Sequence, residues 1–150
     1  MVKAHRFPVS IQWQEGRLTR AAAPGKSDLE VATPAEFKHG IADVWSPEDL
    51  LVASTAADYA MTLLAVADGK RLTLLDLQVD GTGHVERRKD GRYGFVVIEL
   101  VARVAVEPEQ VESAEKAARY AKDACLVGLA LDTPIHLEVF VEAREVAPAV

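Results

Sequence analysis

The sequence predicts a single α+β domain that spans residues 1–150, and three observations support this fold class. Apolar and polar residues alternate along several stretches, which is typical of strands with one buried face. Two other stretches, residues 45–68 and 108–132, carry helical patterns. The length of 150 residues suits one domain, and 49% hydrophobic with 27% charged residues is ordinary globular composition.

The N-terminal part predicts three strands. In "FPVSIQW", residues 7–13, Phe7, Val9, Ile11 and Trp13 share one face, so we expect a half-buried strand here. "QEGR" reads as a turn and "RLTRAAA" as the returning strand. A short strand near residues 29–32 follows, and then a loop rich in Gly, Pro and polar residues.

The central and C-terminal parts predict a second, broad antiparallel sheet. Asp90-Gly91 predicts a hairpin turn, because such a turn needs a positive φ and glycine adopts a positive φ readily. "YGFVVIELVARVAVE" is the longest alternating strand, and "TPIHLEVFVE" is the closing one. Alternation of this length indicates a sheet with one covered face.

The first helix opens with a capping sequence. Ser46 can cap its N-terminus, Pro47 fits the first helical position and Asp49 completes a capping box. Beyond the cap nearly every face is apolar, so we expect this helix to be buried on most sides. Its polar stripe is Thr55, Asp58 and Thr62, at spacings of three and four.

This stripe has two interpretations. It is either the solvent-facing edge of the helix or the lining of a cleft. In a cleft, the buried Asp58 carboxylate needs either protonation or a cationic partner.

The second helix carries a narrow apolar seam on one side and ion pairs on the other. Glu112 with Lys116 and Glu115 with Arg119 stand four residues apart on the polar face. The seam consists of Val111, Ala114, Ala118, Ala121 and Cys125.

Composition excludes several classes of partner. The net charge is −6 and no basic stripe is present, so we expect neither nucleic acid nor an anionic membrane as a partner. The apolar run at residues 50–67 is interrupted by Asp58 and other polar residues, so it is not interpreted as a membrane span.

The histidines, the single cysteine and the N-terminal sequence bear on metal binding, cofactors and cellular compartment. The four histidines lack the close spacings of a metal site, and no motif indicates a cofactor. One cysteine excludes an internal disulfide, which fits a reducing cytosol, and the N-terminus lacks the apolar core of a signal peptide. We therefore expect a cytoplasmic protein without metal or cofactor.

Two motifs carry a resemblance to a known family. "SPEDL" at residues 46–50 opens a helix rich in small residues, and "KDACLVGLALDTPIHLEV" lies on the second helix before a closing strand. Both resemble the family of osmotically inducible protein C and organic hydroperoxide resistance proteins (OsmC/Ohr). The resemblance covers nearly the whole chain. It implies antiparallel sheets packed around two long helices in an intertwined homodimer.

The resemblance also implies a chemistry. In this family a first cysteine attacks an organic hydroperoxide as a thiolate and becomes a sulfenic acid, and a second cysteine resolves it as a disulfide. A dithiol then reduces the disulfide. The sites lie at the subunit interface, where an arginine and the glutamate of the "PE" step keep the thiolate active.

Placed on this pattern, the chain departs from it at the first cysteine. Counting from "SPEDL", that position falls on Asp58, whereas Glu48 and Cys125 match the glutamate and the second cysteine. The family arginine has no clear counterpart; Lys38 lies near one of its places, and Arg17 or Arg20 are other candidates. A carboxylate cannot be oxidised as a thiolate is, so the two-cysteine cycle cannot run in this chain.

Three hypotheses follow. In the first, the protein is a non-peroxidase member that binds a small apolar ligand at the dimer interface, with Asp58 as polar anchor, Lys38 or an arginine as its partner and Thr55 and Thr62 in the lining.

In the second, Cys125 is the nucleophile of a one-cysteine hydroperoxide peroxidase. Its place at a helix C-terminus counts against this, because the helix dipole disfavours a thiolate there. In the third, Asp58 and Glu48, with His39 nearby, perform acid–base or hydrolytic chemistry.

Each of these residues also has a purely structural interpretation. Glu48 and Asp49 are favourable charges at a helix N-terminus. Lys38 and His39 read equally as loop surface, and Cys125 as a small core residue.

Overall fold

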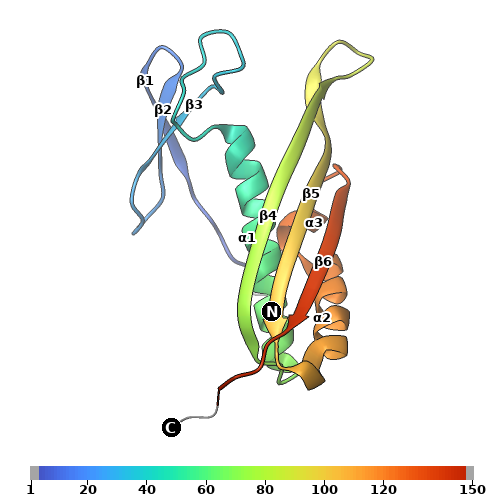
Figure 1. The fold of residues 1–150 in the computed structure, drawn as a ribbon. Coiled ribbons are helices and arrows are strands. Elements are labelled where there is room, and N and C mark those ends of the chain that lie inside the picture. The colour runs from blue at the N-terminus through green and yellow to red at the C-terminus, as the bar shows by residue number, and fades with distance from the viewer. Residues whose placement is uncertain (1–3, 148–150) are drawn as a thin grey trace. The chain divides into compact units, whose positions relative to one another are not determined.

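The computed structural model describes residues 4–147 and divides the chain into two compact units, residues 1–51 and 52–150. The first unit holds a three-stranded sheet of order β1-β2-β3, and the second holds another of order β4-β5-β6 (Figure 1). The α+β class is therefore confirmed. The elements are β1 (Ser10–Glu15), β2 (Leu18–Ala22), β3 (Leu29–Ala32), α1 (Pro47–Gly69), β4 (Leu74–Arg87), β5 (Tyr93–Val106), α2 (Val111–Ala124), α3 (Leu126–Leu129) and β6 (Ile135–Ala143).

The sheet of the first unit is antiparallel throughout, as predicted. Its first strand differs from the expectation. β1 begins at Ser10 rather than at Phe7. The predicted apolar row is exposed, with Phe7 before the strand 86% and Trp13 on the strand 70% accessible. Alternation marks which residues share a face of a strand, but not whether anything covers that face.

The capping box at the start of α1 is confirmed. The backbone N–H and the hydroxyl of Ser46 both donate to Asp49 Oδ2, at 2.9 and 2.8 Å. The backbone N–H of Asp49 donates back to Ser46 Oγ at 3.0 Å. These reciprocal bonds satisfy backbone donors that the first turn of a helix leaves free.

The burial of α1 is narrower than expected. By length and composition alone this helix could cross a membrane, yet a row of its side chains packs inside the chain. The prediction of burial on most sides is wrong for the single chain, because Met61 is 67% exposed and Leu64 is exposed as well. The buried row is Thr55, Tyr59, Leu63 and Ala67.

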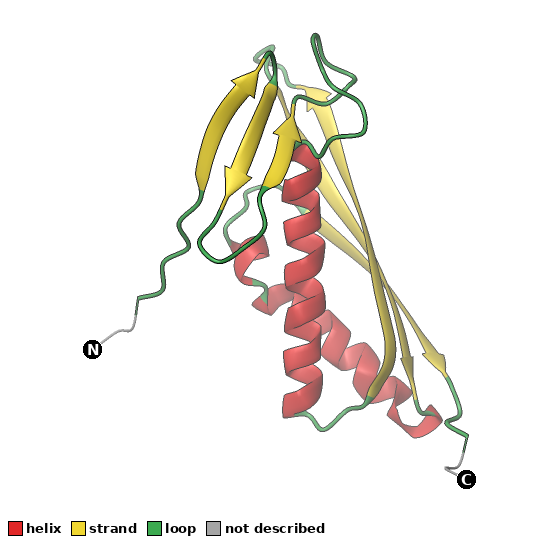
Figure 2. Cartoon of the chain, turned by 90° about the vertical axis from the view of Figure 1, so that its left-hand side faces the viewer, coloured by secondary structure: helices red, strands yellow, loops and turns green. Residues whose placement is uncertain are grey.

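The core of the second unit lies between its helices and one face of its sheet, as Figures 1 and 2 show. β5 supplies the inward row that its alternation predicts, and α2 supplies the alanines of its seam. Tyr59 extends into this core and donates its hydroxyl to the carbonyl of Ala118 at 3.0 Å. The buried members are Tyr59, Leu63, Ile98, Leu100, Ala102, Val104, Val106, Ala114, Ala117, Ala118, Ala121 and Cys125.

The second sheet is mixed rather than wholly antiparallel. β4 and β5 pair antiparallel as expected, but β6 runs parallel to β5, with Ile98 opposite Ile135. Between β5 and β6 the chain passes through α2, and parallel neighbours need a crossover of this kind. Alternation predicts a strand here, but pairing direction depends on this connection.

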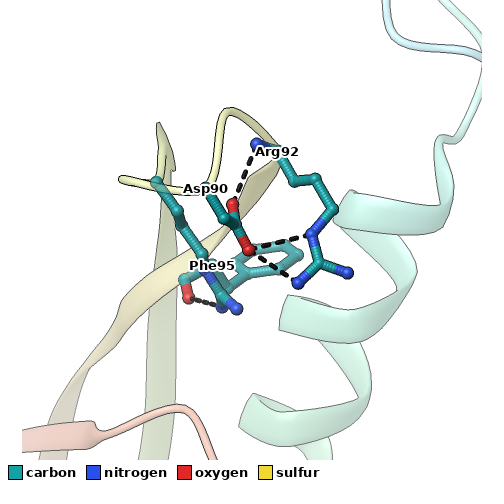
Figure 3. Close-up of polar contacts among 4 residues, drawn as sticks. Asp90, Arg92 and Phe95 are labelled. Atoms are coloured by element: carbon teal, nitrogen blue, oxygen red, sulfur yellow. Dashed lines mark hydrogen bonds and ion pairs between the residues drawn. The ribbon is translucent and has the colours of Figure 1, made fainter.

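The β4–β5 hairpin turns where the sequence predicts, at Gly91, whose φ is +84°. Asp90 fixes the turn, because its carboxylate accepts bonds from the backbone N–H of Arg92 at 3.0 Å and from its guanidinium at 2.9 and 2.6 Å (Figure 3). Arg88 donates to the carbonyl of Phe95 at 2.8 Å on the same hairpin.

The second helix is interrupted, which the sequence did not indicate. α2 ends at Ala124, and Cys125 has an extended backbone with φ −69° and ψ 120°. The chain then forms the short helix α3. A new helix start leaves new backbone N–H groups without partners, and the bond that one of them makes defines the candidate site.

Candidate functional site

The candidate site lies in the second unit, where α1 faces the break between α2 and α3. Asp58 on α1 is half-buried, and its Oδ2 accepts a hydrogen bond from the backbone N–H of Val127 at 2.9 Å. Val127 is the second residue of α3, so Asp58 caps that helix from a distance in sequence. The other carboxylate oxygen, Oδ1, has no hydrogen-bond partner within residues 4–147.

Cys125 lies directly before α3 and is buried. Its thiol donates to the carbonyl of Ala121 at 3.0 Å, the previous turn of α2. Burial raises the pKa of the Cys125 thiol; a hydrogen bond from Thr62 works in the opposite direction, while the charges of Asp58 and Asp123 raise it further. The site therefore favours the protonated thiol over the thiolate.

The three residues of the polar stripe of α1 differ in how deeply they are buried. Thr55 is buried, and Asp58 and Thr62 are half-buried. Thr62 and Asp58 both act on Cys125, so the structure brings three of the predicted site residues together.

Tyr59 is a neighbouring group that the sequence analysis did not single out. Burial raises its pKa, and Cys125 adds to this effect. No local sequence pattern marks it as part of the site, because its role depends on packing against α2.

The other predicted site residues belong to the first unit. Glu48 is half-buried, and its Oε2 is buried without a hydrogen-bond partner in the described part of the chain. Lys38 and His39 are exposed in the loop after β3. The pairing of Asp58 with Lys38 and the acid–base grouping of Asp58, Glu48 and His39 stay predictions.

The two arginines considered for the family arginine differ in their contacts. Arg20 donates to Gln12 Oε1 at 2.8 Å and pairs with Asp28 at 3.6 Å. The side chain of Arg17 makes no hydrogen bond or ion pair among the residues described, and it borders a surface cavity together with His39. Arg20 is therefore engaged within its own sheet.

Exposed apolar residues neighbour Asp58 and its hydrogen-bond partner along the chain. Ala57 and Met61 lie beside it on α1, and both are exposed. Leu126, next to its hydrogen-bond partner in α3, is 72% exposed. We call these three residues the apolar rim of Asp58.

Possible metal ligands do not form a cluster among the described residues. Among residues 4–147 no group of three or more His, Cys, Asp or Glu side chains could hold a metal ion.

Comparison with known proteins identifies relatives. Residues 40–140 match the protein family described as OsmC-like protein. No curated protein sequence matches the chain.

Solved structures share the fold. An OsmC-like protein of unknown function from Vibrio cholerae matches with a TM-score of 0.82 at 14% identity, covering 91% of this chain and 100% of that one. An OsmC-like protein from Mycoplasma pneumoniae has a TM-score of 0.79 at 17% identity, covering 93% and 99%. An organic hydroperoxide resistance protein from Elizabethkingia anophelis, with thiocyanate bound, has a TM-score of 0.76 at 20% identity and covers 96% and 100%.

Proposed function

Because the chain belongs to the OsmC-like protein family, which is associated with organic hydroperoxide resistance, we propose that it is a member without thiol peroxidase activity that binds a small apolar ligand. The observation that carries the proposal is the state of Cys125, the one cysteine of the chain. Its buried thiol donates to a backbone carbonyl at 3.0 Å. In the proposed alignment Asp58 takes the place of the peroxide-attacking cysteine.

The chemistry of the site supports the loss of the peroxidase cycle. Attack on a hydroperoxide O–O bond needs a thiolate, and resolution as an intramolecular disulfide needs a second thiol. One cysteine cannot supply both. A one-cysteine cycle would need Cys125 as an accessible thiolate, whereas burial and two nearby carboxylates raise its pKa.

The surroundings of Asp58 support ligand binding. A polar group surrounded by apolar side chains is typical of a small-molecule site, where the polar group fixes orientation and the apolar surface supplies affinity. Asp58 offers its free Oδ1, and the apolar rim (Ala57, Met61 and Leu126) supplies the apolar surface. We propose a ligand with one hydrogen-bond donor, such as a hydroxyl, on a short hydrocarbon body.

A second copy of the chain is part of this proposal. The exposed face of α1 carries Met61 and Leu64, and exposed apolar surface of this kind commonly becomes an interface. A homodimer would cover this face and close the ligand site over the apolar rim. The buried, unpartnered Oε2 of Glu48 is a further group that a ligand or a partner could satisfy.

Thermal unfolding in the presence of short and medium-chain primary alcohols tests the ligand. We expect the melting temperature to rise with alcohol concentration and chain length, because a ligand that binds only the folded state stabilises it. Leu126→Asp should abolish the rise, since it places a charge in the apolar rim. Val146→Asp, at an exposed position outside the rim, serves as the matched control and should retain it.

Two outcomes would contradict the proposal. If no alcohol stabilises the wild-type protein, the ligand class is wrong. If Leu126→Asp responds as the wild type does, the ligand binds elsewhere.

A thiol measurement separates this proposal from the one-cysteine alternative. Native protein exposed to an alkyl hydroperoxide should retain a reduced Cys125 by mass spectrometry, and alkylation should be slow until the protein is unfolded. Rapid oxidation to a sulfenic acid would support the alternative.

A further inference from the structure

A cavity of about 230 Å³ lies on the outer face of the β4–β5–β6 sheet, opposite the face that packs on the helices. Strand register explains why the face is hollow here. Ala105 on β5 stands between Asp76 on β4 and Glu142 on β6. Because its side chain is a single methyl between two longer neighbours, Ala105 is buried and lies at the base, or floor, of the cavity.

An aromatic ring borders this floor. In the adjoining row of the sheet, Arg103 on β5 is directly opposite Phe140 on β6, and both line the cavity. Phe140 is 51% exposed on a face whose other long side chains are mostly charged or polar. A half-exposed ring beside a planar guanidinium forms a surface on which a second flat group can stack.

The charges of the cavity are already paired within the chain. Arg144 donates to Glu142 Oε1 at 2.8 and 3.2 Å and lies 3.7 Å from Asp76 Oδ2. Arg103 forms an ion pair with Asp80. An incoming ion would compete with these exposed pairs and gain little, so the cavity favours an uncharged ligand.

The polar edges of the cavity remain able to bond a neutral molecule. Asp76 and Glu142 present carboxylate oxygens, which accept, and Arg103 presents N–H groups, which donate. A ligand that satisfies both needs donors and acceptors on its rim. The volume lies below the roughly 300–1,000 Å³ of sites for drug-sized molecules, which limits the ligand to one ring or a fused pair.

We propose that this cavity binds a neutral, planar heteroaromatic ring with hydrogen-bond donors and acceptors on its edge, stacked on Phe140 beside Arg103. Nucleobases are one member of this chemical class. The site is separate from the ligand site at Asp58 and does not depend on it.

Titration of the ¹⁵N-labelled protein with free adenine tests the proposal by NMR. We expect saturable shifts of the backbone amides of Ala105 and Phe140. Phe140→Leu keeps an apolar side chain but removes the ring, and it should weaken binding about tenfold, which is within the range for loss of one stacked base. Tyr120→Leu removes an exposed aromatic ring from α2 and should leave the affinity unchanged.

Two further arms make the test decisive. Arg103→Lys keeps the charge but loses the planar fork, so it should also weaken adenine binding; it replaces Phe140→Leu as the test if that variant does not fold. Benzoate is a flat anion and should bind more weakly than adenine. Absence of saturable shifts, wild-type affinity in both cavity variants, or tighter binding of benzoate would overturn the proposal.

Discussion

The carboxylate of Asp58 and the backbone N–H of Val127 are joined by a hydrogen bond of 2.9 Å across 69 residues of sequence. The bond satisfies a backbone donor that the helix break at Cys125 leaves free. It gives Asp58 a structural role in addition to any role in binding. It also places a negative charge beside the one thiol of the chain.

Removal of this cap should destabilise the protein. We expect Asp58→Ala to lower the free energy of unfolding by about 1–2 kcal/mol, the usual cost of losing a capping side chain. Asp58→Asn retains an oxygen acceptor and should lose less. Urea denaturation measures both, and wild-type stability of Asp58→Ala would show that the bond to Val127 contributes nothing.

Restoring a thiol at position 58 tests the alignment with the family. We expect Asp58→Cys to form a disulfide with Cys125 when the protein meets an alkyl hydroperoxide, detected by mass spectrometry. Ala60→Cys is the matched control, because a position two residues further along the helix points about 200° away from Asp58. A folded Asp58→Cys protein that forms no disulfide would contradict the alignment.

Alkaline pH should destabilise the fold through Cys125. Its pKa is raised in the folded state, chiefly by burial, so the folded protein holds a proton that the unfolded chain releases. This stability is present below the ordinary thiol pKa and is lost as the pH rises through the folded-state value. The free energy of unfolding should therefore fall more steeply from pH 8 to pH 10 in the wild type than in Cys125→Ala. If the free energy of unfolding fell equally with pH in both proteins, the raised pKa of Cys125 would be contradicted.

Gly83 on β4 allows α1 to approach the sheet. A Cβ at this position would lie 2.5 Å from Phe95 Cε1 and 2.7 Å from Val52 Cγ2. We expect Gly83→Val to cost about 1–3 kcal/mol through overpacking. Gly69→Ala, where a Cβ meets nothing within 4 Å, is the control and should be neutral or stabilising. Equal effects in thermal unfolding would argue against a close approach at Gly83.

The exposed face of α1 predicts an oligomer. Light scattering should give the mass of a homodimer for the wild type. Met61→Asp should shift it toward the 16.3 kDa monomer, because a charge at an apolar interface is costly to bury. The same substitution at the exposed Leu129 is a comparison on α3. A monomeric wild type at working concentration would refute the dimer.

Local patterns in the sequence predicted the elements but not their surroundings. The capping box of Ser46 and Asp49 and the turn at Gly91 depend on neighbouring residues, so they could be read directly. The exposure of Trp13 and Met61 could not, because alternation and helical spacing say which residues share a face but not what covers it.

The site was predictable only in part. The spacing of Asp58 and Thr62 indicated a common stripe, and the seam of α2 placed Cys125 in the core. The contact of Asp58 with Val127 uses a backbone N–H, which every residue but proline carries, so no residue type marks it. The break at Cys125 has no local signal that we can identify in "KDACLVGLALD".

Hydroperoxide consumption by the purified protein with a dithiol reductant tests the central claim most directly. Wild type and Cys125→Ser should both consume an alkyl hydroperoxide no faster than buffer with the dithiol alone. Rapid consumption by the wild type that Cys125→Ser abolishes would show that Cys125 is a working nucleophile, and it would contradict the assignment of this chain as a family member without peroxidase activity.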